Sequence, residues 1–167
     1  IIANLDSISY ADYIDVVDDR DFAAIRNDPR WKAFLSNAIL VARKTFVKLE
    51  QAGDQLGILK ERKMTAIAWI LNENYDSVFY HLDLFTASNV LTFSTADEAV
   101  KNGYFRRLYK DKRWLDFKIK AYRKGFQVLS AKLREMGNKA GISERREVAI
   151  ACAYSDQKDS AFHHLNI

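Results

Sequence analysis

Proline and glycine are scarce in this sequence, with one proline and six glycines among 167 residues. An all-β fold of this length needs many tight turns, and those turns depend on the two residue types that are rare here. The scarcity therefore argues against an all-β fold, whereas plentiful Ala, Leu, Lys, Arg and Glu favour helices. Apolar residues make up 49% of the chain, which is enough to bury one continuous core or two small ones. The composition thus predicts a folded, all-α protein.

A single cysteine, Cys152, rules out an internal disulfide. We expect a buried structural thiol and favour a cytoplasmic location, with periplasmic and secreted locations left open. No apolar run approaches the roughly 18 residues typical of a membrane span. The first residues also lack the basic flank and apolar stretch of a signal peptide. We therefore expect a soluble chain without membrane insertion.

Charge is unevenly distributed along the chain. The net charge is +4, yet residues 101–146 contain 15 Lys and Arg against 4 Asp and Glu. An acidic pole lies near the start, where residues 12–21 contain five aspartates. This asymmetry indicates an acidic partner. The simpler alternative is that the two poles of one molecule, or of neighbouring molecules, attract each other.

The chain contains an internal repeat with an offset of 83 residues. Residues 59–82 and 142–165 are identical at ten of 24 positions, where unrelated sequences share about one or two. A second block, residues 22–34, shares the offset, and five of its residues fall on identical residues of 105–117: Phe22, Asp28, Arg30, Trp31 and Phe34. We therefore predict two units, at about 1–83 and 84–167, within a single helical repeat domain.

Each unit is predicted to contain helices in the same order. Asp28 before Pro29 indicates the start of a long amphipathic helix at 29–52, ended by Gly53. Its counterpart is capped by Asp111 and ends at Gly137. The other predicted helices are 59–73, 76–87, 143–155 and 159 to the end of the chain, with short helices at the capping-box sequences Ser9–Asp12 and Thr95–Glu98. Because the chain begins and ends inside a unit, we also expect it to be part of a longer array.

Residues 147–154 and 158–165 resemble the helical hairpin of the tetratricopeptide-repeat (TPR) family. Small residues stand at its close-packing positions, Ala149 and Ala161. Residues 21–31 resemble the segment that follows the last such repeat in bacterial proteins, where a capped helix begins with Asp-Pro-Arg and an aromatic residue. The sequence departs from the family in its period and in the turn glycine, which is replaced by Glu73 and Asp156.

The resemblance implies an all-α tandem repeat, a TPR-like α-solenoid, whose first hairpin helices line a groove for a peptide or protein. The implied groove residues are Lys63, Ile67, Ile70 and Leu71 in the first hairpin and Arg146, Ile150, Ala153 and Tyr154 in the second. The asparagines with which some members clamp a terminal carboxylate are absent, so no such clamp is expected. The main prediction is a non-catalytic binding scaffold without a cofactor.

Two groups of residues bear on metal binding and catalysis: the adjacent histidines and the polar residues that recur in both units. His163 and His164 are adjacent, so on a helix they point about 100° apart and do not converge on one ion. Residues that recur in both units, such as Asp28 with Asp111 and Glu61 with Glu144, are better explained as caps, staples and ion pairs than as a catalytic site. An enzyme whose site the sequence does not display is therefore only the third hypothesis.

Nucleic-acid binding is the second hypothesis. Cationic residues alternate with aromatic ones between residues 104 and 126, which is typical of surfaces that contact phosphates and stack on bases. The candidate residues of this basic face are Arg106, Arg107, Lys110, Lys120, Arg123 and Lys124. The simpler interpretation is a solvated helix face, because several of the aromatic residues have matches in the first unit.

Overall fold

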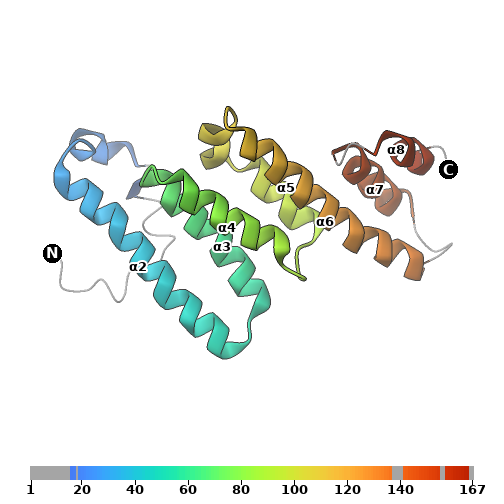
Figure 1. Ribbon diagram of the computed structural model, residues 1–167, viewed down its shortest axis with the longest axis horizontal. Helices are drawn as coiled ribbons and strands as arrows, with labels where there is room; N and C mark the ends of the chain where they lie inside the picture. The colour runs from blue at the N-terminus through green and yellow to red at the C-terminus, as the bar shows by residue number, and fades with distance from the viewer. Residues whose placement is uncertain (1–15, 18, 137–140, 155–156, 166–167) are drawn as a thin grey trace. The chain divides into compact units, whose positions relative to one another are not determined.

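The computed structural model describes residues 16–17, 19–136, 141–154 and 157–165, and every regular element within these ranges is a helix (Figure 1). The all-α class predicted from composition is therefore confirmed. None of the helices described there has the length and apolar character that crossing a bilayer requires. The chain divides into two compact units, Ile1–His81 and Leu82–Ile167.

The first unit contains the 3₁₀ helix η2 (Arg20–Ile25), followed by the long helix α2 (Pro29–Ala52). Asp28 caps α2 by accepting a hydrogen bond from the Arg30 N–H at 2.8 Å. Gly53 ends it in the left-handed conformation, with φ of +68°, which glycine adopts without a steric penalty. The sequence predicted both ends of this helix.

Helix α2 packs against α3 (Gln55–Leu71), which is followed by α4 (Tyr75–Ala87). The cluster between α2 and α3 consists of small and branched residues: Ala38, Ile39, Ala42 and Ala68. Helix α3 begins four residues earlier than predicted, because Asp54 caps it by accepting from the Gly57 N–H at 2.8 Å. The boundary between the two units falls inside α4.

The turn between α3 and α4 contains a strained residue. Glu73 has a φ of +57°, a conformation that side chains with a Cβ disfavour. Next to it, Asn72 fastens the turn with its side-chain N–H groups, which donate to the carbonyl oxygens of Ala68 at 2.9 Å and Leu35 at 3.3 Å. The turn glycine missing from this sequence is therefore replaced by a glutamate that adopts a glycine-like backbone.

The second unit contains α5 (Phe93–Lys101), the 3₁₀ helix η3 (Gly103–Leu108), α6 (Lys112–Met136), α7 (Ile142–Tyr154) and α8 (Lys158–Leu165). Helix α5 is capped by Thr92, which accepts from the Thr95 N–H at 3.2 Å. The prediction that Thr95 caps this helix is thus wrong by one turn. The short helix predicted at Ser9–Asp12 lies outside the described residues.

Helix α6 packs on α5 and on α7, and α7 packs on α8. At Gly125 the backbone of α6 lies close to α5, and an added Cβ would be 2.7 Å from the Phe93 Cα. On the α7 side, Leu129, Val148, Cys152 and Ala161 form a buried cluster. Burial of the Cys152 side chain confirms the expected buried thiol.

The start of α6 repeats the local geometry of the start of α2. Asp111 accepts from the Arg113 N–H at 2.9 Å and pairs with its guanidinium at 2.8 Å. Asp28 makes both contacts with Arg30, each at 2.8 Å. In each unit a phenylalanine of the 3₁₀ helix also packs on the tryptophan that follows the cap, with centroids 6.3 Å apart in the first and 5.5 Å in the second. The predicted caps and ion pairs at these positions are confirmed.

Candidate functional site

The predicted groove residues of the first hairpin lie on α3, where two of the four are buried. The side chains of Ile67 and Ile70 are 1% and 0% exposed, and Lys63 and Leu71 are half-buried. Ile67 is one of four consecutive residues, from 65 to 68, that are all buried. Successive side chains of a helix point about 100° apart, so four in a row point around most of its circumference. Because all four are buried, this part of α3 exposes little surface to solvent. It therefore differs from the open groove that the sequence predicted.

The predicted groove residues of the second hairpin lie together on α7 and are exposed. Arg146, Ile150, Ala153 and Tyr154 follow the i, i+4, i+7, i+8 spacing of one helix face, and all four are open to solvent. Ile150 is 36% exposed and Tyr154 is 45% exposed. This face of α7 combines two large apolar side chains with one guanidinium.

The Tyr154 ring rests on a fixed support. It stacks on the ring of Tyr122 in α6, with centroids 4.5 Å apart and planes 12° from parallel. The buried Tyr122 hydroxyl donates to Asp97 Oδ1 at 3.0 Å, and Asp97 Oδ2 accepts from Lys101 at 2.6 Å. Burial, followed by this hydrogen bond to Asp97, raises the pKa of Tyr122, so its hydroxyl remains a neutral donor at physiological pH. Three helices thus hold one exposed aromatic ring in place.

The candidate residues of the basic face predicted at 101–124 are divided between η3, the turn after it and α6. Its cations are exposed except for Lys124, which is half-buried. Lys120 pairs with Asp83 at 2.9 Å, so part of its charge is balanced within the second unit. Tyr109, between the η3 arginines and Lys110, is 53% exposed and stacks on Trp114 at 5.5 Å.

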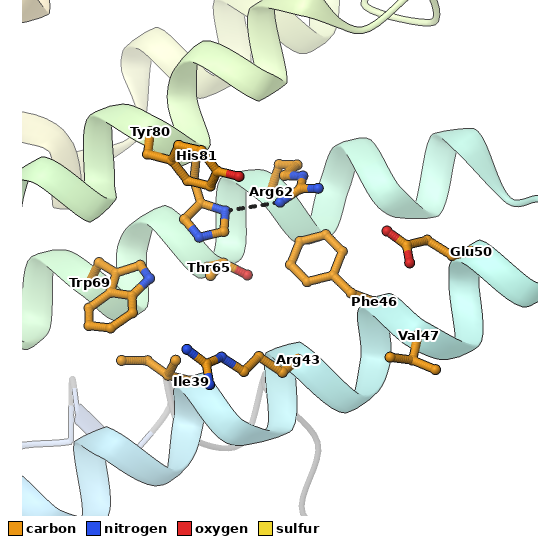
Figure 2. Close-up of a pocket in the computed structure, with 10 residues that line it drawn as sticks. All are labelled: Ile39, Arg43, Phe46, Val47, Glu50, Arg62, Thr65, Trp69, Tyr80 and His81. Carbon is orange, nitrogen blue, oxygen red and sulfur yellow. Dashed lines mark hydrogen bonds between the residues drawn. The ribbon is translucent and has the colours of Figure 1, made fainter.

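The first unit contains a pocket of about 370 Å³ that sequence reasoning did not identify (Figure 2). It lies among α2, α3 and α4. Apolar walls and two guanidiniums share its surface, and the full lining is Ile39, Arg43, Phe46, Val47, Glu50, Arg62, Thr65, Trp69, Tyr80 and His81. No sequence motif marks it, because its polar groups come from three helices that meet only in the folded chain.

Arg62, His81 and Phe46 form one packed group at this pocket. The Arg62 guanidinium lies over the Phe46 ring, 4.3 Å from its centroid. His81 stacks on the same ring at 6.1 Å and accepts from Arg62 through Nδ1 at 3.4 Å. Since a guanidinium can only donate, the hydrogen of the neutral imidazole is on Nε2. Burial, and then the Arg62 charge, lower the pKa of His81 to about 4, so His81 is neutral at pH 7. His81 therefore packs within this group as a neutral ring.

Two polar side chains on α3 are buried without partners. Thr65, in the pocket wall, is 2% exposed, and Glu61, one turn earlier, is 8% exposed. Thr65 Oγ1 and Glu61 Oε1 have no hydrogen-bond partner among the described residues. Burial raises the pKa of Glu61 to about 7. Glu61 therefore lies in the buried stripe of α3, one turn before Thr65.

Within the described residues, no group of three His, Cys, Asp or Glu side chains is placed to hold a metal ion. The side chain of His164, one of the two histidines considered for metal binding, lies outside the described residues. The sequence matches no protein-family model, and no curated protein or solved structure compared with it gives a match.

Proposed function

We propose that this chain is a non-catalytic helical binding module that holds an acidic, partly apolar peptide or protein segment against the exposed face of α7. The observation that carries the proposal is the joint exposure of Arg146, Ile150, Ala153 and Tyr154 on that face. Helices that bind peptides commonly present such an apolar stripe with a charged residue at its border.

Two further features support this assignment. Tyr154 is held in place by its stacking on Tyr122, and a pre-positioned aromatic ring loses little conformational entropy when it binds. The second unit also carries 16 Lys and Arg residues against 10 Asp and Glu residues, so an acidic segment would be attracted to it. A TPR-like tandem repeat remains part of the proposal. It is supported by the shared offset of 83 residues between η2 and η3, which start at Arg20 and Gly103.

The proposal is tested by selecting linear peptides from a random display library against the purified chain. We expect enrichment of peptides that combine acidic and large apolar residues. Their affinity, measured by fluorescence anisotropy, should fall at least tenfold in Tyr154→Ala, because a central aromatic contact contributes about 2 kcal/mol. Leu40→Ala, at a residue of α2 that is 53% exposed, is the matched control and should bind normally. Selected peptides that bind Tyr154→Ala and Ile150→Asp as tightly as the unchanged chain would refute the proposal.

A specific observation also favours nucleic-acid binding as a second candidate. Arg106, Arg107 and Lys110 are exposed around Tyr109, and none of the three pairs with a carboxylate in the described part of the chain. An exposed ring among unpaired cations can stack on a base while the cations contact phosphates. This candidate predicts binding of a mixed-sequence single-stranded oligonucleotide that weakens steeply between about 50 and 200 mM salt. Absence of binding at the lower salt concentration, or binding unchanged by Arg106→Glu with Arg107→Glu, would exclude it.

A further inference from the structure

We propose that the pocket of the first unit is a binding site for a small organic carboxylate with a flat apolar body, such as an aromatic acid. The site is separate from the α7 face, and neither the sequence repeat nor the peptide-binding proposal requires it. Its volume of about 370 Å³ lies at the small end of the range for ligand pockets, which is about 300 to 1,000 Å³. A ring system bearing one carboxylate fits that volume.

The polar groups of the pocket are mainly hydrogen-bond donors. Arg43 on α2 and Arg62 on α3 both line it, and neither makes an ion pair with a carboxylate within the described residues. Glu50 is the one carboxylate of the lining, so the two guanidiniums leave an excess of one positive charge. A planar guanidinium matches the geometry of a carboxylate and donates two parallel hydrogen bonds to it.

Thr65 provides the independent observation that the pocket is built for a polar ligand. Its side chain is 98% buried, lines the pocket and carries a hydroxyl without a partner. In Figure 2, Thr65 lies between His81 and the side chains that α2 contributes. A buried hydroxyl left unsatisfied destabilises a folded protein. A ligand oxygen in the pocket would satisfy it.

The remaining walls suit the body of the ligand. Ile39, Phe46, Val47 and Trp69 contribute apolar surface from α2 and α3. Arg62 is already held over Phe46 and beside His81, so its guanidinium is positioned before a ligand arrives. Pre-positioning reduces the ordering that binding requires. Flat apolar walls beside two cations, of which Arg62 is held in place, favour an aromatic acid over a free inorganic anion.

The test uses the full chain with 1-naphthoate as the probe and 1-naphthamide as its uncharged match. The chain has three tryptophans, so Trp69→Phe identifies which indole N–H signal in a ¹H–¹⁵N NMR spectrum belongs to the pocket. We expect 1-naphthoate to shift the Trp69 signal with a dissociation constant on the order of 1 mM, as is usual for a ligand of this size. 1-Naphthamide should bind at least about tenfold more weakly, because it lacks the charge that the arginines recognise.

Substitutions locate the site. Arg43→Gln removes an exposed pocket cation and should weaken 1-naphthoate about tenfold while leaving 1-naphthamide unaffected. Lys48→Gln removes the same charge from an exposed position of α2 outside the lining and is the control. Thr65→Val should weaken 1-naphthoate severalfold although it removes an unsatisfied hydroxyl. The proposal is overturned if 1-naphthoate at concentrations up to about 20 mM does not shift the Trp69 signal, or if 1-naphthoate and 1-naphthamide bind with the same affinity. It is equally overturned if Arg43→Gln and Lys48→Gln have the same effect.

Discussion

The hairpin helices α3 and α7 share an internal sequence repeat yet expose different faces. The identical pair Ile67 and Ile150, 83 residues apart, makes the contrast plain, since the first is 1% exposed and the second 36%. By contrast, the caps at Asp28 and Asp111 have the same geometry in both units. Local sequence is therefore sufficient to set a cap, whereas the exposure of a helix face depends on what packs around it. A repeated residue need not have a repeated role.

The largest expected effect on stability concerns Glu61, whose carboxyl is buried on α3. The folded chain retains the Glu61 proton up to about pH 7, whereas the unfolded chain releases it near pH 4.5. The contribution of Glu61 to the free energy of unfolding is therefore greatest below pH 4.5. It falls by about 3 kcal/mol as the pH rises to 7. Glu61→Gln should thus match the unchanged chain at pH 4.5 and exceed it in stability at pH 8.

Urea unfolding followed by circular dichroism at several pH values measures this difference. His81 acts in the opposite direction, because its lowered pKa makes stability rise with pH between about 4 and 6.5. The comparison of Glu61→Gln with the unchanged chain removes that contribution, since both retain His81. A difference that stays constant from pH 4.5 to 8 would show that Glu61 is not buried as described.

The next effect compares the two long helices at equivalent positions, Ala42 in α2 and Gly125 in α6. An added Cβ at Gly125 would lie 2.7 Å from the Phe93 Cα, so Gly125→Ala should lower the free energy of unfolding of the second unit by about 2 kcal/mol. Ala42→Gly introduces no clash, but it loses helix propensity and a buried methyl of the α2–α3 cluster, which together should cost about 2 kcal/mol. At an open helix position, Gly→Ala stabilises, so a gain in stability for Gly125→Ala, measured by urea unfolding, would mean that α5 and α6 do not approach as closely as they do here.

The turn after α3 gives an effect of the opposite sign. Glu73 has a φ of +57°, so Glu73→Gly should raise the free energy of unfolding by about 1 kcal/mol through relief of backbone strain. Asn72→Gly is the control, because it removes the side-chain hydrogen bonds to Ala68 and Leu35 and should destabilise. If Glu73→Gly destabilises as well, the left-handed conformation at this turn is contradicted.

The caps provide the smallest effect, and here the two units should behave alike. Asp28→Ala and Asp111→Ala each remove a hydrogen bond to a helix N-terminus and a pairing with the arginine two residues later. Each substitution should lower the unfolding midpoint by a few degrees. Asp28→Asn and Asp111→Asn, which keep the cap oxygen, should lower it less. If only one of the two substitutions lowered the unfolding midpoint, the two caps would not be equivalent.

The sequence predicted the long helices well, because their ends carry strong local signals. Asp28 with Pro29 marks one start, and Gly53 marks one end. It missed the start of α3, since Asp54 directly follows the helix-ending glycine and was counted as part of the loop. The capping threonine of α5 was misplaced by one turn, because Thr92 and Thr95 both stand near the helix start and only backbone geometry separates them.

The candidate site was less accessible to sequence reasoning. The α7 residues were predicted only through the resemblance to the TPR hairpin, and the equivalent α3 residues, predicted in the same way, are buried or half-buried. The pocket was missed altogether because Arg43, Arg62 and His81 come from three helices. Their convergence is a property of tertiary packing, which periodicity along one helix does not encode.

The most direct test of the central claim is thiol accessibility at the two equivalent isoleucines. In a Cys152→Ala background, which removes the single native thiol, Ile67→Cys and Ile150→Cys are each treated with an aromatic disulfide reagent and their labelling rates compared. Because the Ile67 side chain is buried and that of Ile150 is exposed, we expect Ile150→Cys to react at a rate close to that in denaturant and Ile67→Cys at least about 100-fold more slowly. Similar rates at the two positions, with both variants folded by circular dichroism, would contradict the claim that α7 presents a face that α3 covers.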